Sequence, residues 1–231
     1  MSIISIEQAR KVLEVIDAGL CSGVGQPVPG QMCVEAAVRH GLGLPHGDDP
    51  VCVEPAIRAF NIALNDKGWS SNEARAKGLR RIGIAQLGSD GTVDGKDFAK
   101  RLSEKAIRVL VPMAMESAAS CNPKHAEALR AAAIRCKDKG TESAANAAYA
   151  AANAADAAAN AVYAAANAVY AAVDAVDAAV DAVDAADAAD AARRDSIYTL
   201  TADLAVDVLR EMGAPGIALM DELIPHNEGG K

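Results

Sequence analysis

An alanine-rich repeat fills the middle of the chain and limits the folds that are open to it. Residues 141–192 contain no glycine or proline, and their polar residues recur every seven positions. The first row of the repeat is Asn146, Asn153, Asn160, Asn167, Asp174 and Asp181, and the second is Tyr149, Asp156, Tyr163, Tyr170, Asp177 and Asp184. Rows separated by three and four positions share one face of a helix, and alanine is the strongest helix former. The repeat therefore predicts one very long helix with a polar stripe and a broad Ala/Val surface.

Three arrangements would accommodate such a helix: a lone helix, a close-packed coil within or between chains, or a ligand-binding face formed by the Asn and Tyr rows. A seven-residue period fits coiled-coil-like packing best, so we expect the Ala/Val surface to be covered and the protein to be a homo-oligomer. The aspartates of the repeat would fan out along a straight helix instead of converging on one point. We therefore predict no metal site there.

The rest of the chain also has helical periodicity. Only 3% of its residues are aromatic, and alanine supplies much of the 51% hydrophobic content, which suits closely packed helices. We predict an all-α helical bundle with an N-terminal helical domain (1–140), the repeat helix (141–194) and a C-terminal helical hairpin (195–231) that packs back on the bundle. In the first domain, Ser5 and Gln8 have the spacing of a capping box, and Gly41 and Gly43 are expected to close a helix over 31–40.

Charge and cysteine content exclude several classes of partner. The net charge is −8, and residues 141–192 carry seven Asp, one Glu and no Lys or Arg, so the remainder of the chain is neutral. A nucleic-acid partner would need a basic surface, which we do not expect. The chain shows neither a long apolar span nor a basic segment at its start, so we expect no membrane association and no signal peptide. Five cysteines without metal-ligand spacing predict reduced thiols in a cytoplasmic protein.

The segment GQPVPGQMCVEAAVRHGLGLPHGDDPVC, residues 25–52, holds the densest group of reactive side chains. Cys33 stands near a predicted helix N-terminus, where the helix dipole would lower the pKa of its thiol, and papain-like hydrolases place their nucleophile similarly. His46 could act as the base, oriented by Asp48 or Asp49. A buried structural cysteine is the commoner role, so hydrolysis by Cys33 is kept as an alternative.

A ligand-binding role is the other reading of the N-terminal half. Helix N-termini with arginines can bind an anion, and an indole can stack on a base. The candidate ligand-binding residues are Arg39, His46, Asp48, Arg58, Trp69 and Arg81. In the plainer alternative, the arginines are solvent-exposed and Trp69 is a core residue. The chain lacks GxxxxGK[ST] and a strand followed by GxGxxG, so no cofactor is predicted.

The block GQPVPGQMCVEAAVRHGLGLPHGDDPVCVEPAIRAFNIALND, continuing through WSSNEARAKGLRRIGIAQLGS, resembles one in phage and prophage proteins that have no assigned activity. Those proteins similarly carry Ala-rich tracts and an ending similar to LAVDVLREMGAPGIALMDEL. The resemblance transfers no functional residue. It implies a setting, since accessory phage proteins often counter host defence by sequestering nucleotide immune signals or by inhibiting defence complexes.

Three functions are therefore expected, in order. The first is a phage-type accessory protein that binds a small nucleotide-derived immune signal without turnover, as an oligomeric helical assembly in the cytoplasm of an infected or lysogenic bacterial host. The second is a structural oligomer or an inhibitor that binds a host defence protein through the long helix. The third is the Cys33-dependent hydrolase.

Overall fold

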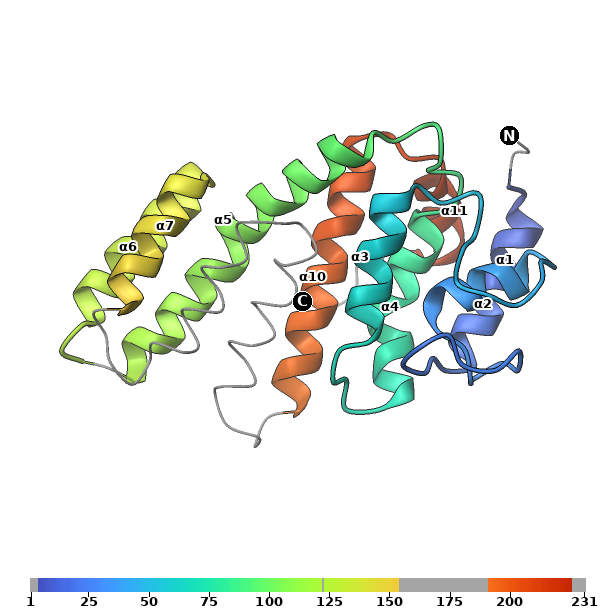
Figure 1. The fold of residues 1–231 in the computed structure, drawn as a ribbon, viewed down its shortest axis with the longest axis horizontal. Coiled ribbons are helices and arrows are strands. Elements are labelled where there is room, and N and C mark those ends of the chain that lie inside the picture. Colours follow the sequence, from blue (N-terminus) through green and yellow to red (C-terminus); the bar gives the residue numbers. More distant parts are fainter. Residues whose placement is uncertain (1–3, 122, 154–190, 226–231) are drawn as a thin grey trace. The chain divides into compact units, whose positions relative to one another are not determined.

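The computed structural model describes residues 4–121, 123–153 and 191–225, and every regular element in those ranges is a helix (Figure 1). The all-α prediction is therefore confirmed for this part of the chain. The helices are α1 (Ile6–Asp17), α2 (Val34–Gly41), α3 (Pro55–Asn65), α4 (Asn72–Ala85), α5 (Gly95–Cys121), α6 (Ala126–Lys139), α7 (Glu142–Asn153), α10 (Ala191–Glu211) and α11 (Gly216–Leu223). None of these described helices has the length and apolarity that crossing a bilayer requires.

The single long helix predicted over the repeat is not shown. The first part of the repeat forms α7, and its last two residues begin α10. Residues 154–190 lie outside the described residues, so the coiled-coil-like packing of the repeat and the homo-oligomer remain predictions. The longest described helix is α5, with 27 residues.

The chain divides into two compact units, which we treat separately. Unit 1 comprises residues 1–98 and 205–231, and unit 2 comprises residues 99–204. The boundaries of these units fall inside α5 and α10. The predicted domain boundaries at residues 140 and 194 stay predictions.

In unit 1, α4 packs against α1, α2, α3 and α11. The helix α2 also packs against α1 and α3, and α11 also contacts α1. Helix α2 begins later than predicted because residues 31 and 32 are paired with the preceding loop, which leaves Cys33 as the N-cap. Its last residue, Gly41, lies directly on α1: a Cβ atom at this position would be 2.5 Å from the Cα of Val12. The backbones of α1 and α2 can therefore approach this closely only because residue 41 has no side chain.

In unit 2, α6 and α7 form a helical hairpin that turns at Gly140, a residue in the left-handed conformation. Its buried contacts are largely small side chains, among them Ala132, Ala133, Ala144, Ala145 and Ala148. The Arg108 guanidinium on α5 donates to the carbonyl groups of residues 137, 138 and 139, which end α6. These carbonyls have no partner within a helix, so the arginine supplies the C-terminal cap.

Candidate functional site

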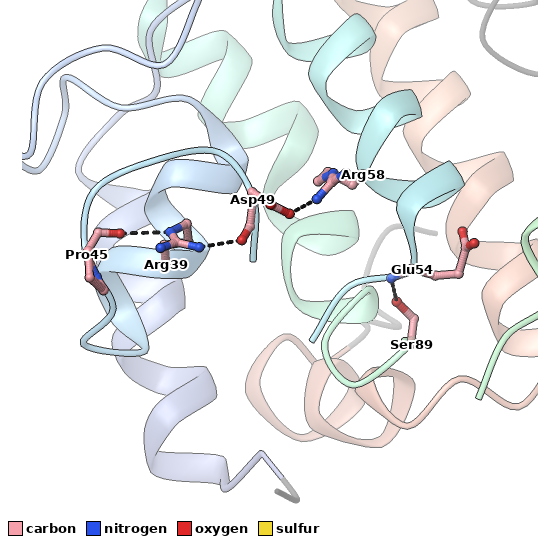
Figure 2. Close-up of polar contacts among 6 residues, drawn as sticks. All are labelled: Arg39, Pro45, Asp49, Glu54, Arg58 and Ser89. Atoms are coloured by element: carbon pink, nitrogen blue, oxygen red, sulfur yellow. Dashed lines mark hydrogen bonds and ion pairs between the residues drawn. The ribbon is translucent and has the colours of Figure 1, made fainter. Parts of the chain in front are cut away.

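Two arginines from neighbouring helices hold the loop that joins α2 to α3 (Figure 2). Nε of Arg39 donates to the Pro45 carbonyl oxygen at 2.8 Å, and its Nη1 donates to the carbonyl oxygen of Asp49. Arg58, in the first turn of α3, forms an ion pair with the Asp49 carboxylate. The end of the loop is also fixed, since the backbone N–H of Glu54 donates to Ser89 Oγ at 2.9 Å. Residues 44–50 are thus tied down by contacts from both helices.

A second loop, residues 21–33, contacts the first. Nε2 of His46 lies 3.1 Å from the carbonyl oxygen of Gly25. The second loop is closed by backbone hydrogen bonds from Cys21 to Met32 and from Gln26 to Gln31. The structure therefore brings the predicted residues Arg39, His46 and Arg58 to one region of unit 1, and Asp48 belongs to the same loop as His46.

The remaining two predicted residues lie elsewhere in unit 1. Trp69 is only 7% exposed, and its indole N–H donates to the Leu64 carbonyl oxygen at 3.0 Å, beside the C-terminal end of α3. Arg58 is in the first turn of that helix, so Trp69 is at the opposite end from it. Trp69 is a core residue, and its ring is not available for stacking on a ligand. Arg81 is half-buried on α4.

Three polar side chains meet in the core of unit 1. Glu35 in α2, Asn61 in α3 and Gln86 at the C-cap of α4 are each fully buried, and we refer to them as the buried polar cluster. Nδ2 of Asn61 donates to Gln86 Oε1 at 2.7 Å. Four atoms have no hydrogen-bond partner among the described residues: both oxygens of Glu35, Oδ1 of Asn61 and Nε2 of Gln86. A protonated Glu35 accounts for all four, because its O–H is a donor for Asn61 Oδ1 and its other oxygen is an acceptor for Gln86 Nε2.

The protonation of Glu35 follows from its burial. Burial raises the pKa of the Glu35 carboxyl to about 8, whereas the amides of Asn61 and Gln86 and the Arg58 guanidinium act to lower it. Each amide lowers this pKa through a hydrogen bond to the Glu35 carboxyl. Because the effect of burial is the larger, Glu35 is a neutral carboxylic acid at neutral pH.

The structure favours the buried structural role expected for Cys33 over the reactive thiolate of the hydrolase alternative. Sγ of Cys33 does cap α2, accepting the Ala36 N–H at 3.3 Å, but the thiol is buried. Burial raises the pKa of the Cys33 thiol to about 11, with the Glu35 carboxyl acting in the same direction. Desolvation of the thiolate outweighs the stabilisation that a helix N-terminus provides.

We expect Cys33 to react with iodoacetamide near neutral pH at least tenfold more slowly in the folded protein than in urea. The folded thiol is shielded and carries little thiolate, whereas the unfolded chain restores the ordinary pKa of a cysteine. Mass spectrometry of the peptide that contains Cys33 measures the two rates. Equal rates in the folded and unfolded protein would contradict the buried, protonated thiol.

Sequence reasoning missed all three residues of the buried polar cluster, although a signal was present. Asn61 has the helical spacing of Ile57 and Leu64, two apolar residues of the same face, and Glu35 is three positions from Val38. A polar residue on an apolar helical face is a candidate for burial. The pattern does not reveal that two such faces meet.

Neither a metal site nor a known relative points to the function of this region. In the described ranges, no three His, Cys, Asp or Glu side chains are grouped so as to hold a metal ion. Comparison with protein-family models, with curated proteins and with solved structures finds no match in any of the three.

Proposed function

We propose that this protein binds a small nucleotide-derived ligand without turnover, in unit 1. The observation that carries the proposal is the gathering of Arg39, His46 and Arg58 at the loop over residues 44–50. Arginine side chains beside a surface loop are suited to binding the phosphate of a nucleotide.

Arg39 and Arg58, on the two helices that flank this loop, supply the positive charge that a phosphate would need. The partner of Arg58 is Asp49, whose side chain is 70% exposed. In the proposed complex, the phosphate takes the place of the Asp49 carboxylate as the partner of Arg58.

Binding without turnover accounts for the residues of this region better than hydrolysis does. The Cys33 thiol holds its proton well above neutral pH, and His46 is directed to the Gly25 carbonyl oxygen. A nucleophile paired with its base is the arrangement that covalent catalysis uses. The setting of the proposal, sequestration of an immune signal by a phage protein in a bacterial cytoplasm, comes from the resemblance alone. The alternative function through the long helix concerns mostly residues 154–190, which lie outside the described part of the chain.

The test is titration of the full chain with a panel of cyclic and ADP-ribose-type nucleotides, followed by calorimetry and by native mass spectrometry. We expect stoichiometric binding with the nucleotide recovered intact. We expect Arg58→Ala to weaken this binding at least tenfold, because a charge-assisted hydrogen bond to phosphate contributes about 1.5–3 kcal/mol.

The matched control is Arg80→Ala. Arg80 also forms a partly exposed ion pair in unit 1, with Asp17, at 2.6 Å. If every nucleotide of the panel fails to bind, or if both arginine variants bind equally well, the proposed function is wrong.

A further inference from the structure

The buried polar cluster attaches the N-terminal end of α2 to α3 and α4. With its proton in place, Glu35 donates to Asn61 Oδ1 and accepts from Gln86 Nε2, and Asn61 Nδ2 donates to Gln86 Oε1 at 2.7 Å. Each of the three side chains thus gives one hydrogen bond and receives one, so the bonds close a ring. An ionised Glu35 has no donor for Asn61 Oδ1, and the loss of one proton therefore breaks this ring.

The surroundings of Glu35 do little to stabilise its charge. The charged or titratable groups near it are Arg58, Asp48, Cys33 and Cys52. Arg58, the only cation among them, is paired with Asp49. Every buried residue of α1 is apolar, and the buried arginine of α4, Arg75, donates to the carbonyl oxygens of residues 65 and 20. A Glu35 carboxylate is therefore more stable in water, which reaches it only if this end of α2 moves away.

The segment that precedes α2 is well suited to such a movement. Residues 22–29 are exposed, and the segment is attached to the end of α3, where Asn65 Oδ1 accepts the Val34 N–H at 3.1 Å and Asp66 Oδ1 accepts the Gly23 N–H at 2.7 Å. A segment with few buried contacts opens at a lower free energy than a whole domain. Cys33, the N-cap of α2, is buried and would become accessible when this end of the helix opens.

We infer that the Glu35 proton is a latch for the N-terminal end of α2: when the proton leaves, this end separates from α3 and α4 and exposes Cys33, while unit 2 stays closed. The latch operates whether or not a nucleotide binds. In the open form Glu35 has the ordinary pKa of 4.5, whereas burial raises its pKa to about 8 in the closed form. Between these two values, the ratio of open to closed form therefore rises about tenfold for each pH unit.

The experiment compares two buried thiols of the same folded chain, Cys33 in unit 1 and Cys136 in unit 2. Both are alkylated with iodoacetamide at several pH values between about 5.5 and 7.5, at reagent concentrations to which the rates are proportional, and mass spectrometry of the two peptides gives the rates. A buried thiol reacts from the open form, as the thiolate, and the thiolate fraction itself rises about tenfold per pH unit in this range. We expect the rate to rise about 100-fold per pH unit at Cys33 and about tenfold at Cys136.

Glu35→Gln is the control for the proton, since its amide keeps a donor and an acceptor but does not ionise. We expect the Cys33 rate in this variant to rise only about tenfold per pH unit. The inference is wrong if Cys33 in the wild-type protein is no steeper than Cys136, or if the variant keeps the wild-type steepness. Equally steep rises at both thiols of the wild-type protein would mean that the chain opens as a whole, and would also overturn it. If the variant does not fold, the comparison of the two thiols in the wild-type protein decides.

Discussion

Replacing Gly41 with alanine is expected to destabilise the protein by more than about 3 kcal/mol, which exceeds the usual cost of overpacking a core. The added Cβ atom would lie 2.5 Å from the Cα and 2.6 Å from the backbone nitrogen of Val12. Backbone atoms cannot rotate away as a side chain can, so α1 and α2 would have to separate. The loss is expected although alanine favours a helix by about 1 kcal/mol over glycine. Chemical denaturation followed by circular dichroism measures it.

Gly68→Ala is the matched control. No heavy atom lies within 4 Å of the Cβ position at Gly68, so alanine fits without displacing a neighbour. We expect this variant to change the free energy of unfolding by less than about 1 kcal/mol. If Gly41→Ala were as stable as Gly68→Ala, α1 and α2 could not approach each other as closely as the structure describes.

The stability of the protein is expected to fall as the pH rises from about 4.5 to about 8, because of Glu35. The folded protein keeps the Glu35 proton up to about pH 8, whereas the unfolded chain loses it near the ordinary value of 4.5. Between these values the folded state binds one more proton than the unfolded state, so a rise in pH favours unfolding. Each pKa unit contributes about 1.4 kcal/mol, and the whole window amounts to about 5 kcal/mol at most.

Glu35→Gln isolates this effect from the other titrating groups of the chain. The variant has a neutral side chain of nearly the same shape and cannot ionise, so its unfolding free energy should lack the Glu35 contribution at every pH. Urea unfolding of both proteins at several pH values below about 8.5, before cysteine thiols ionise, gives the two curves. We expect them to diverge progressively above about pH 4.5. Parallel curves would mean that Glu35 is ionised in the folded protein.

The two predictions test different properties of unit 1. Gly41→Ala tests the framework that holds α2 in place, and so the position of Glu35. The pH dependence tests the protonation state of Glu35, and it does so without any ligand. If both predictions are confirmed but no nucleotide binds, the described core is supported and only the proposed function is wrong.

Much of the fold could be predicted from the sequence because helices depend on local interactions. The capping box at the start of α1 is present as predicted, with Ser5 Oγ accepting the backbone N–H of Gln8. The expected boundaries were less accurate where a loop contact competes with the helix, as at α2, which begins after Cys33 instead of at residue 31.

The roles of individual residues were harder to predict. Gly41 and Gly43 were both expected to end a helix. Gly43 adopts a positive φ of 71°, in keeping with a residue that ends a helix, but Gly41 is the last residue of α2 and allows contact with α1. Likewise, Arg39 and Arg58 do gather with His46 near one loop, but they are engaged by the protein's own carbonyl and carboxylate oxygens.

The sequence by itself determined the all-α class and the helical elements of the described residues, because caps, glycines and periodicity act over a few positions of the chain. Only the tertiary structure decided that the Cys33 thiol is protonated, that Trp69 is a core residue and that Glu35 meets Asn61 and Gln86. Each of these properties depends on how far water is excluded by helices that are distant in the sequence. Burial of a charge or a donor is a property of the packed neighbours, and no local pattern contains it.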